Sequence, residues 1–209
     1  MQYIQIYIKF FRFELLIIFI TSFQSKNLKQ DKNKSIQRML IKSYKQFKQT
    51  ELSSYDKIMV HLRGNSIEQK ASQQIAQKLL GCLNLQALEL NLSNNKLGAQ
   101  SISFISLSLV SCDQLVSLSL DLSQNQIGLF GITNLVENLS KCKNLSILKI
   151  DISQNKVLSQ SFIALGNGLR NCNKISNLQL IIEYNKGEII RLKQKITKMI
   201  RLVQKIIKN

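Results

Sequence analysis

The chain repeats itself every 30 residues, and this period limits its possible folds more than any other feature. Its four cysteines, Cys82, Cys112, Cys142 and Cys172, follow one another at steps of 30 residues. The same step recurs in Leu85, Leu115, Leu145 and Ile175; in Leu88, Leu118, Leu148 and Leu178; in Leu90, Leu120, Ile150 and Leu180; and in Asn95, Asn125, Asn155 and Asn185. Such a period indicates stacked units that contact only their neighbours and build an extended surface rather than a closed pocket.

Each unit combines the pattern of a strand with that of a helix. Leu88, Leu90 and Leu92 alternate with other residues, which predicts a strand with its leucines turned inward. Ile102, Ile105 and Leu109 then follow at steps of three and four, which predicts a helix. Strand, helix and strand again make a βα repeat with parallel strands. A degenerate unit without the cysteine precedes the four regular ones, so about five units are expected.

The segments LQALELNLSNNKLG, LVSLSLDLSQNQIG and LSILKIDISQNKVL resemble the leucine-rich repeat, LxxLxLxxNxL. The unit length with a full helix is similar to the ribonuclease-inhibitor-like class. The resemblance implies an α/β leucine-rich-repeat solenoid, a horseshoe with parallel strands on the concave face and helices on the convex face. It also implies protein partners on the concave face, and asparagines that hold the turn after each strand. Alignment on Leu85 leaves two extra residues before the asparagine, so a longer strand or wider turn is expected.

The rest of the chain divides by composition. Residues 1–23 are predicted to be an apolar leader of uncertain role, 24–51 a basic polar linker, 52–187 the repeats, and 188–209 a basic amphipathic helix that caps the stack. Residues 3–23 contain Lys9, Arg12 and Glu14, so they lack the run of about 20 apolar residues that spans a membrane. A signal peptide stays an alternative, although Glu14 is misplaced for one and no small-residue cleavage site follows.

The formal charge of +17 does not indicate nucleic-acid binding when its distribution is considered. Lysine and arginine minus aspartate and glutamate give +7 for residues 1–51 and +6 for 181–209, against +2 for 82–180. Lysine runs in flanking segments are usually solvated, so no specific nucleic acid is expected as a partner.

The cysteines are predicted to be small buried apolar residues in a reduced compartment. Metal sites bring ligands together as closely spaced pairs, and neither CxxC nor CxxH occurs, while the single histidine lies outside the cysteine register. No metal ion and no cofactor is expected. No nucleotide-binding, zinc-protease or nucleophile-elbow motif occurs in the sequence, so no catalytic residue is predicted either.

The candidate binding residues are those that alternation places on the open strand face. One column contains Met59, Glu89, Ser119, Lys149 and Gln179, and its neighbour contains His61, Asn91, Asp121, Asp151 and Ile181. Asp121 beside Asp151 is an acidic stripe that would attract a basic or amide-rich segment. The alternative is that these short polar residues only keep an exposed strand face soluble, with Lys149 offsetting the charge. Ser93, Ser123 and Ser153 are assigned to the turns that end the strands.

The sequence therefore predicts a cytoplasmic protein-interaction module that binds a protein partner through its concave strand face and has no catalysis of its own. Two alternatives stay open. One is a peripheral membrane adaptor anchored through residues 3–23 or 188–209. The other is a regulatory GTPase-activating or kinase-associated repeat fragment, for which the resemblance offers a precedent but no matching residue.

Overall fold

The computed structural model describes residues 3–10, 16–20, 37–155, 157 and 159–184. Strands and helices alternate through most of this range. The elements are β1 (Tyr3–Phe10), β2 (Leu16–Ile20), β3 (Arg38–Ile41), α1 (Tyr44–Gln49), β4 (Lys57–His61), α2 (Gln69–Leu80), β5 (Ala87–Asn91), α3 (Ala99–Val110), β6 (Ser117–Asp121), α4 (Gly128–Leu139), β7 (Ile147–Asp151), α5 (Ser159–Arg170) and β8 (Asn177–Tyr184).

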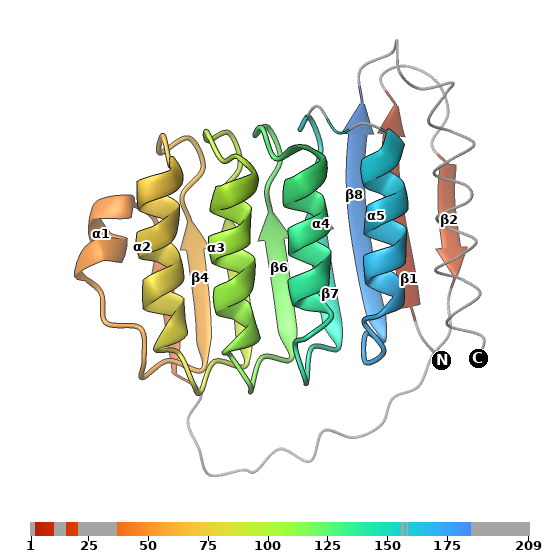
Figure 1. Ribbon diagram of the computed structural model, residues 1–209. Coiled ribbons are helices and arrows are strands. Elements are labelled where there is room, and N and C mark those ends of the chain that lie inside the picture. Colours follow the sequence, from red (N-terminus) through yellow and green to blue (C-terminus); the bar gives the residue numbers. More distant parts are fainter. Residues whose placement is uncertain (1–2, 11–15, 21–36, 156, 158, 185–209) are drawn as a thin grey trace.

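All strands belong to one eight-stranded sheet in the order β2-β1-β8-β7-β6-β5-β4-β3. Neighbours from β3 to β8 are parallel, β1 is parallel to β8, and β2 is antiparallel to β1. Helices α2 to α5 stand side by side over the same face of the sheet (Figure 1). The chain is thus an α/β repeat solenoid, as its sequence predicts.

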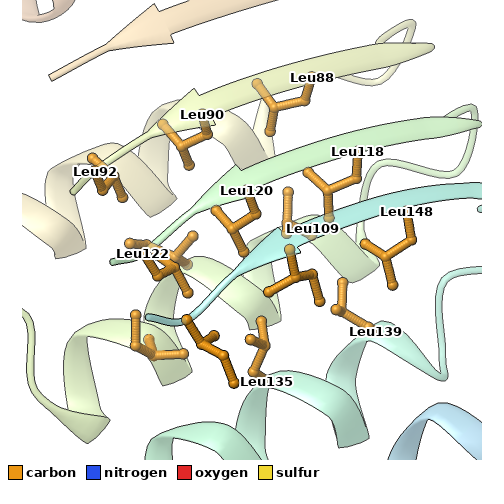
Figure 2. Packing of buried hydrophobic residues seen from close by; sticks show 14 of the residues in the cluster. Leu88, Leu90, Leu92, Leu109, Leu118, Leu120, Leu122, Leu135, Leu139 and Leu148 are labelled. Atoms are coloured by element: carbon orange, nitrogen blue, oxygen red, sulfur yellow. The ribbon is translucent and has the colours of Figure 1, made fainter. Parts of the chain in front are cut away.

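The core lies between the sheet and this row of helices. Burial alternates along β4, β5 and β6, so every second side chain of these strands faces the helices. Leu88, Leu118 and Leu148 are aligned in successive paired strands, and Leu109, Leu135 and Leu139 meet this layer from α3 and α4 (Figure 2). Each fully buried leucine contributes about 1.5 to 3 kcal/mol. Because the leucines of one unit pack on those of the next, the units are stable only as a stack.

A ladder of asparagines holds the turn after each strand. Asn125 Nδ2 donates hydrogen bonds to the carbonyls of Leu92 and Leu122 at 3.0 and 2.9 Å, and its Oδ1 accepts from the Leu97 N–H at 3.0 Å. Asn95 and Asn155 make the equivalent bonds. The side chain therefore joins two successive units through their backbones. The resemblance implied this structural role, and the geometry agrees with it; Asn185 lies outside the described residues.

The cysteines form a second column, at the ends of the helices. Cys82, Cys112 and Cys142 are buried and Cys172 is partly exposed, and all four are free thiols. The prediction of small buried apolar residues is confirmed for the first three. Cys112 Sγ lies 3.6 Å from the Leu79 carbonyl oxygen of the preceding unit. Burial raises the pKa of Cys112 to about 12 and that of Cys142 to about 11, so at neutral pH both are protonated and poor nucleophiles.

Residues 38–49 form β3 and α1, although the segment 24–51 is predicted to be a basic polar linker. β3 pairs with β4 in the repeat register, with Ile41 opposite Val60. Ile41 and Phe47 are fully buried against the first repeat. Ser43 begins α1 by accepting a hydrogen bond from the Gln46 N–H on its side chain. Together β3 and α1 cover the apolar end of the stack that β4 would otherwise expose.

The first strands of the chain lie at the other end of the sheet. β1 pairs along its full length with β8, and Ile4, Ile6 and Ile8 are opposite Leu178, Leu180 and Ile182. The segment 1–23, predicted to be a leader of uncertain role, thus supplies two strands of the sheet. No helix within the described residues is long and apolar enough to cross a membrane. The predicted C-terminal helix 188–209 lies outside the described residues.

Candidate functional site on the open strand face

The face of the sheet opposite α2 to α5 carries the candidate residues, and we call it the strand face. Strand pairing aligns Met59, Glu89, Ser119, Lys149 and Gln179 in one column and His61, Asn91, Asp121, Asp151 and Ile181 in the next. Both predicted columns are therefore confirmed as geometry. All ten side chains are partly or fully exposed, so the face presents a continuous surface to solvent.

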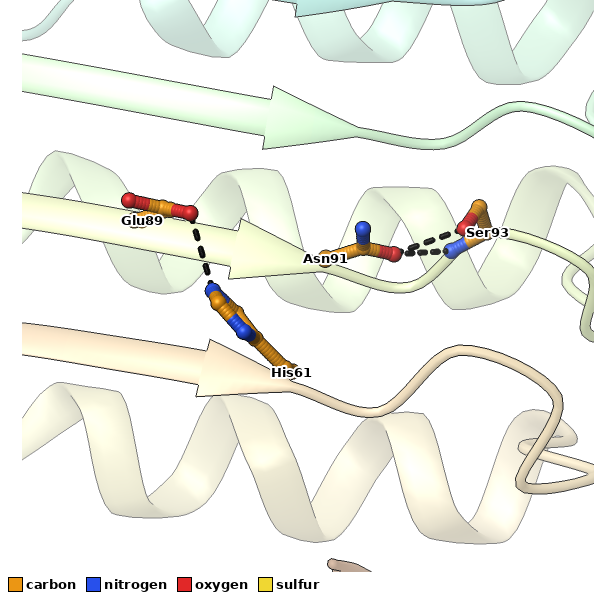
Figure 3. Close-up of polar contacts among 4 residues, drawn as sticks. All are labelled: His61, Glu89, Asn91 and Ser93. Atoms are coloured by element: carbon orange, nitrogen blue, oxygen red, sulfur yellow. Dashed lines mark hydrogen bonds and ion pairs between the residues drawn. The ribbon is translucent and has the colours of Figure 1, made fainter. Parts of the chain in front are cut away.

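A side-chain hydrogen bond joins β4 and β5 at the first two repeats. His61 Nε2 lies 2.8 Å from Glu89 Oε1, and the side chains are 39% and 43% exposed. Figure 3 shows the imidazole of β4 reaching across to the carboxylate of β5. Solvent screens such an exposed pair, so its contribution to stability is small even when the histidine is protonated. Its main effect is to orient Glu89 toward β4.

The column that contains Asp121 and Asp151 also stabilises the turns that follow its strands. Asp121 Oδ1 accepts hydrogen bonds from the Ser123 N–H at 3.0 Å and from the Ser123 hydroxyl at 2.7 Å. Asn91 makes the same two bonds to Ser93 (Figure 3), and Asp151 Oδ1 accepts from the Ser153 N–H at 2.9 Å. These are Asx turns, in which the side-chain oxygen replaces a backbone acceptor. The serines belong to the strand-ending turns, as predicted, and each aspartate has a structural role in its turn.

A hollow of about 140 Å³ opens in the strand face above β6. Its rim and floor include Glu89, Ser119, Asp121, Lys149 and Asp151. Ser119 is the shortest side chain of its column here and lies between the long side chains of Glu89 and Lys149, so the surface sinks at this position. Three carboxylates and one ammonium group therefore border a space of side-chain size.

The environment of Asp151 raises the pKa of its carboxyl group. Partial burial raises the pKa of Asp151 most, and the neighbouring Asp121 raises it further, while the hydrogen bonds from Ser153 and the charge of Lys149 lower it. The net direction is upward because the carboxylate lies half-buried beside a like charge. A cation placed between Asp121 and Asp151 would relieve this repulsion.

Two parts of the face lie outside the two predicted columns. Ala87, Ser117 and Ile147 form a third column, and Ile147 is 43% exposed. Leu40 of β3 continues the first column next to Met59 and is 42% exposed. The alternation of Met39 and Ile41 around Leu40 was the available signal, but a polar, lysine-rich sequence surrounds it. Leu40 and Ile147 thus add two exposed apolar side chains to a face that is otherwise mostly polar.

The described residues hold no group of three or more His, Cys, Asp and Glu side chains that could bind a metal ion. A second hollow, of about 290 Å³, lies in the turns between α4 and β7 and between α5 and β8. Cys142, Cys172 and three lysines, Lys141, Lys143 and Lys174, line it. Lys143 is already paired with Asp113 at 3.1 Å. The candidate site thus presents charged and hydrogen-bonding side chains on an open surface.

Comparisons with known proteins agree at the level of the fold. No family model matches the sequence, and no curated protein matches it. Among solved structures 38 chains match, and one of these is leiomodin-1 actin-binding site 2 (ABS2). It aligns with a TM-score of 0.54 at 13% sequence identity, covering 78% of this chain and 87% of that chain. At this identity the likeness concerns the fold alone: an α/β repeat solenoid, consistent with the leucine-rich-repeat-like architecture that the sequence resembles.

Proposed function

We propose that this protein is a protein-interaction module that binds a protein partner through its strand face and performs no catalysis. One observation carries the proposal: all helices from α2 to α5 cover one side of the sheet, while the other side exposes aligned polar side chains. Large flat surfaces of this kind suit partner recognition, whereas catalysis requires a cleft that excludes water and separates the pKa values of its acids and bases. The name of the leiomodin-1 structure describes an actin-binding site, which gives a protein-binding precedent for the fold.

The charges of the face suggest what the partner presents at its centre. Asp121 and Asp151 each use Oδ1 in an Asx turn, and both carboxylates border the hollow above Ser119. An arginine or lysine on a protruding partner segment fits this space, with its stem beside Ser119 and its charge between the carboxylates. The exposed Leu40 and Ile147 then offer apolar contact on either side.

The test neutralises the two aspartates without disturbing the turns. In the double variant Asp121→Asn plus Asp151→Asn, each side chain keeps an oxygen that accepts from the serine, as Asn91 already does. We expect partners recovered by affinity capture to be lost, and the purified partner to bind at least about tenfold more weakly, which corresponds to about 1.4 kcal/mol.

The matched control removes two negative charges elsewhere. Asp113→Asn plus Glu137→Gln changes exposed residues away from the strand face, in the turn after α3 and on α4. Its partner list and affinity should equal those of the unmodified protein. Equal partner lists for the strand-face variant and the unmodified protein would reject the strand face as the binding surface.

A further inference from the structure

The edge of the sheet at β3 carries a contact that the repeats do not supply. Within the described part of the chain, β3 stands last in the strand order and pairs with β4 alone. An open strand edge presents N–H and C=O groups that can pair with another chain. Proteins limit such pairing with short strands, with charges or with a covering segment. At β3 a glutamine of α1, Gln46, lies on the edge.

The bonds between β3 and β4 show which backbone groups of β3 point outward. The Gln37 carbonyl accepts a hydrogen bond from the Lys57 N–H at 3.1 Å, so it points toward β4. In a strand, the backbone groups of successive residues point to opposite sides. The outward groups are therefore those of Arg38, Leu40 and Lys42, the last of which directly follows the strand.

The side-chain amide of Gln46 bonds to two of these outward groups. Its Nε2 donates to the Leu40 carbonyl at 3.4 Å, and its Oε1 accepts from the Lys42 N–H at 3.0 Å. In a parallel ladder a carbonyl and the N–H two residues later pair with one residue of the neighbouring strand. The Gln46 amide thus occupies the place where an added strand would continue the sheet.

The position of Gln46 is fixed by both ends of α1. Its N–H donates to the Ser43 hydroxyl at 3.2 Å. Its carbonyl accepts from the N–H and the hydroxyl of Thr50 at 3.0 and 2.8 Å. The next residue, Phe47, is buried in the core. A helical turn that the core holds in place therefore presents the glutamine to β3.

We propose that Gln46 closes the β3 edge and keeps the sheet of this chain from joining that of a second copy. The contact that it excludes is β3 against β3 around a twofold axis, since a self-complementary pair uses the same edge twice. With Leu40 opposite Leu40, an antiparallel pair would use the Leu40 carbonyl and the Lys42 N–H. Gln46 holds both groups, so its side chain and a second copy exclude each other.

The side chains of the edge act in opposite directions on this pairing. Leu40 is 42% exposed and would meet its counterpart at the twofold axis, and apolar pairs across strands favour association. The same arrangement sets Arg38 of one copy opposite Lys42 of the other, and like charges in that position disfavour it. Salt screens the repulsion between exposed charges. The hydrogen bonds of Gln46 therefore matter most at high ionic strength.

Sedimentation velocity on the full-length protein tests the proposal. Gln46→Ala removes both hydrogen bonds to the edge and keeps a good helix former in α1. The variant and the unmodified protein are compared over a range of concentrations at low salt and at about 0.5 M salt. At the higher salt we expect Gln46→Ala to dimerise at least about tenfold more tightly than the unmodified protein.

Two further variants and a second measurement locate the effect. Gln49→Ala changes another exposed glutamine of α1 and should associate as the unmodified protein does. Addition of Leu40→Lys to Gln46→Ala should abolish the dimer, because it places two ammonium groups at the twofold axis. Hydrogen exchange of the Lys42 N–H, followed by NMR at low protein concentration, should be faster in Gln46→Ala than in the unmodified protein.

Three results would each overturn the proposal. The first is a Gln46→Ala protein that associates no more tightly than Gln49→Ala at either salt concentration. The second is a dimer that persists after Leu40→Lys is added, since the contact would then lie elsewhere. The third is an unchanged exchange rate of the Lys42 N–H, since Gln46 would then not hold the edge. Circular dichroism confirms that each variant is folded before it is compared.

Discussion

At the scale of single residues, the asparagine ladder is the point where sequence and stability are most directly linked. Asn125 is buried, and its amide bonds to carbonyls of two successive units while its oxygen accepts from Leu97. Substitution of Asn125 by alanine leaves these backbone groups buried without partners. We expect Asn125→Ala to lower the free energy of unfolding by about 2 to 4 kcal/mol, measured by urea denaturation.

The chain contains its own control for that measurement. Asn65 occupies the equivalent position of the first unit but is exposed, with bonds to the Arg63 carbonyl and the Tyr44 N–H. Asn65→Ala should change the unfolding free energy by no more than about 0.5 kcal/mol. If both variants lose the same free energy of unfolding, burial of the asparagine amide does not determine its contribution to stability.

The residue scale also shows how far the candidate site was predictable. Alternation in the sequence places Asp121 and Asp151 on one face, because the side-chain period of a strand is two. The bonds from Ser123 and Ser153 to these carboxylates depend on backbone geometry at the end of the strand. The left-handed backbone of Gln124, with φ of 56°, belongs to the same turn. Sequence spacing assigned the serines to the turn but could not assign their acceptors.

At the scale of elements, contacts between helices depend on a few small residues. A Cβ atom added to Gly168 of α5 would lie 2.1 Å from Cγ2 and 2.4 Å from Cβ of Val136 in α4. Because the Val136 Cβ is fixed to its backbone, the two helices must move apart to accept alanine. We expect Gly168→Ala to lower the unfolding free energy by about 2 kcal/mol. This net value is the cost of overpacking after subtraction of about 1 kcal/mol, which alanine gains over glycine in helix propensity. Urea denaturation measures it.

Gly98→Ala is the matched control for the helix contact. Gly98 precedes α3 with φ of −99°, and nothing lies within 4 Å of an added Cβ. Alanine there should leave stability unchanged or raise it by up to about 1 kcal/mol. A Gly168→Ala protein as stable as the Gly98→Ala protein would show that α4 and α5 do not need the close approach.

Elements outside the regular repeats explain what the sequence could not predict. Strands β4 to β7 and their helices follow from leucine spacing, since that spacing recurs with little change. β3 has only four residues and stands in a lysine- and glutamine-rich segment, so Met39 and Ile41 carried too little signal. The pairing of β1 with β8 joins Gln5 to Gln179. No local pattern reports a contact between residues so far apart.

At the scale of the whole molecule, equivalent units should be removable one at a time. Deletion of residues 98–127, which is 30 residues, joins Leu97 to Gly128 at the same point of the period. Asn155 accepts from the Ile127 N–H and donates to the Leu122 carbonyl, and after the deletion the Leu97 N–H and Leu92 carbonyl take these places. A stack held by nearest-neighbour contacts remains foldable when one unit is lost.

We expect the shortened chain to fold cooperatively with a lower free energy of unfolding and a urea m-value smaller by roughly a fifth, because less surface is exposed on unfolding. Deletion of residues 98–124, which is 27 residues, is the control. It moves every later unit three residues out of register, so the leucine and asparagine columns no longer meet across the junction. Circular dichroism and urea denaturation compare the two, and equal loss of structure in both would mean that the units are not interchangeable. If the 30-residue deletion keeps its structure and the 27-residue deletion loses it, the stability of the stack depends on the register between neighbouring units.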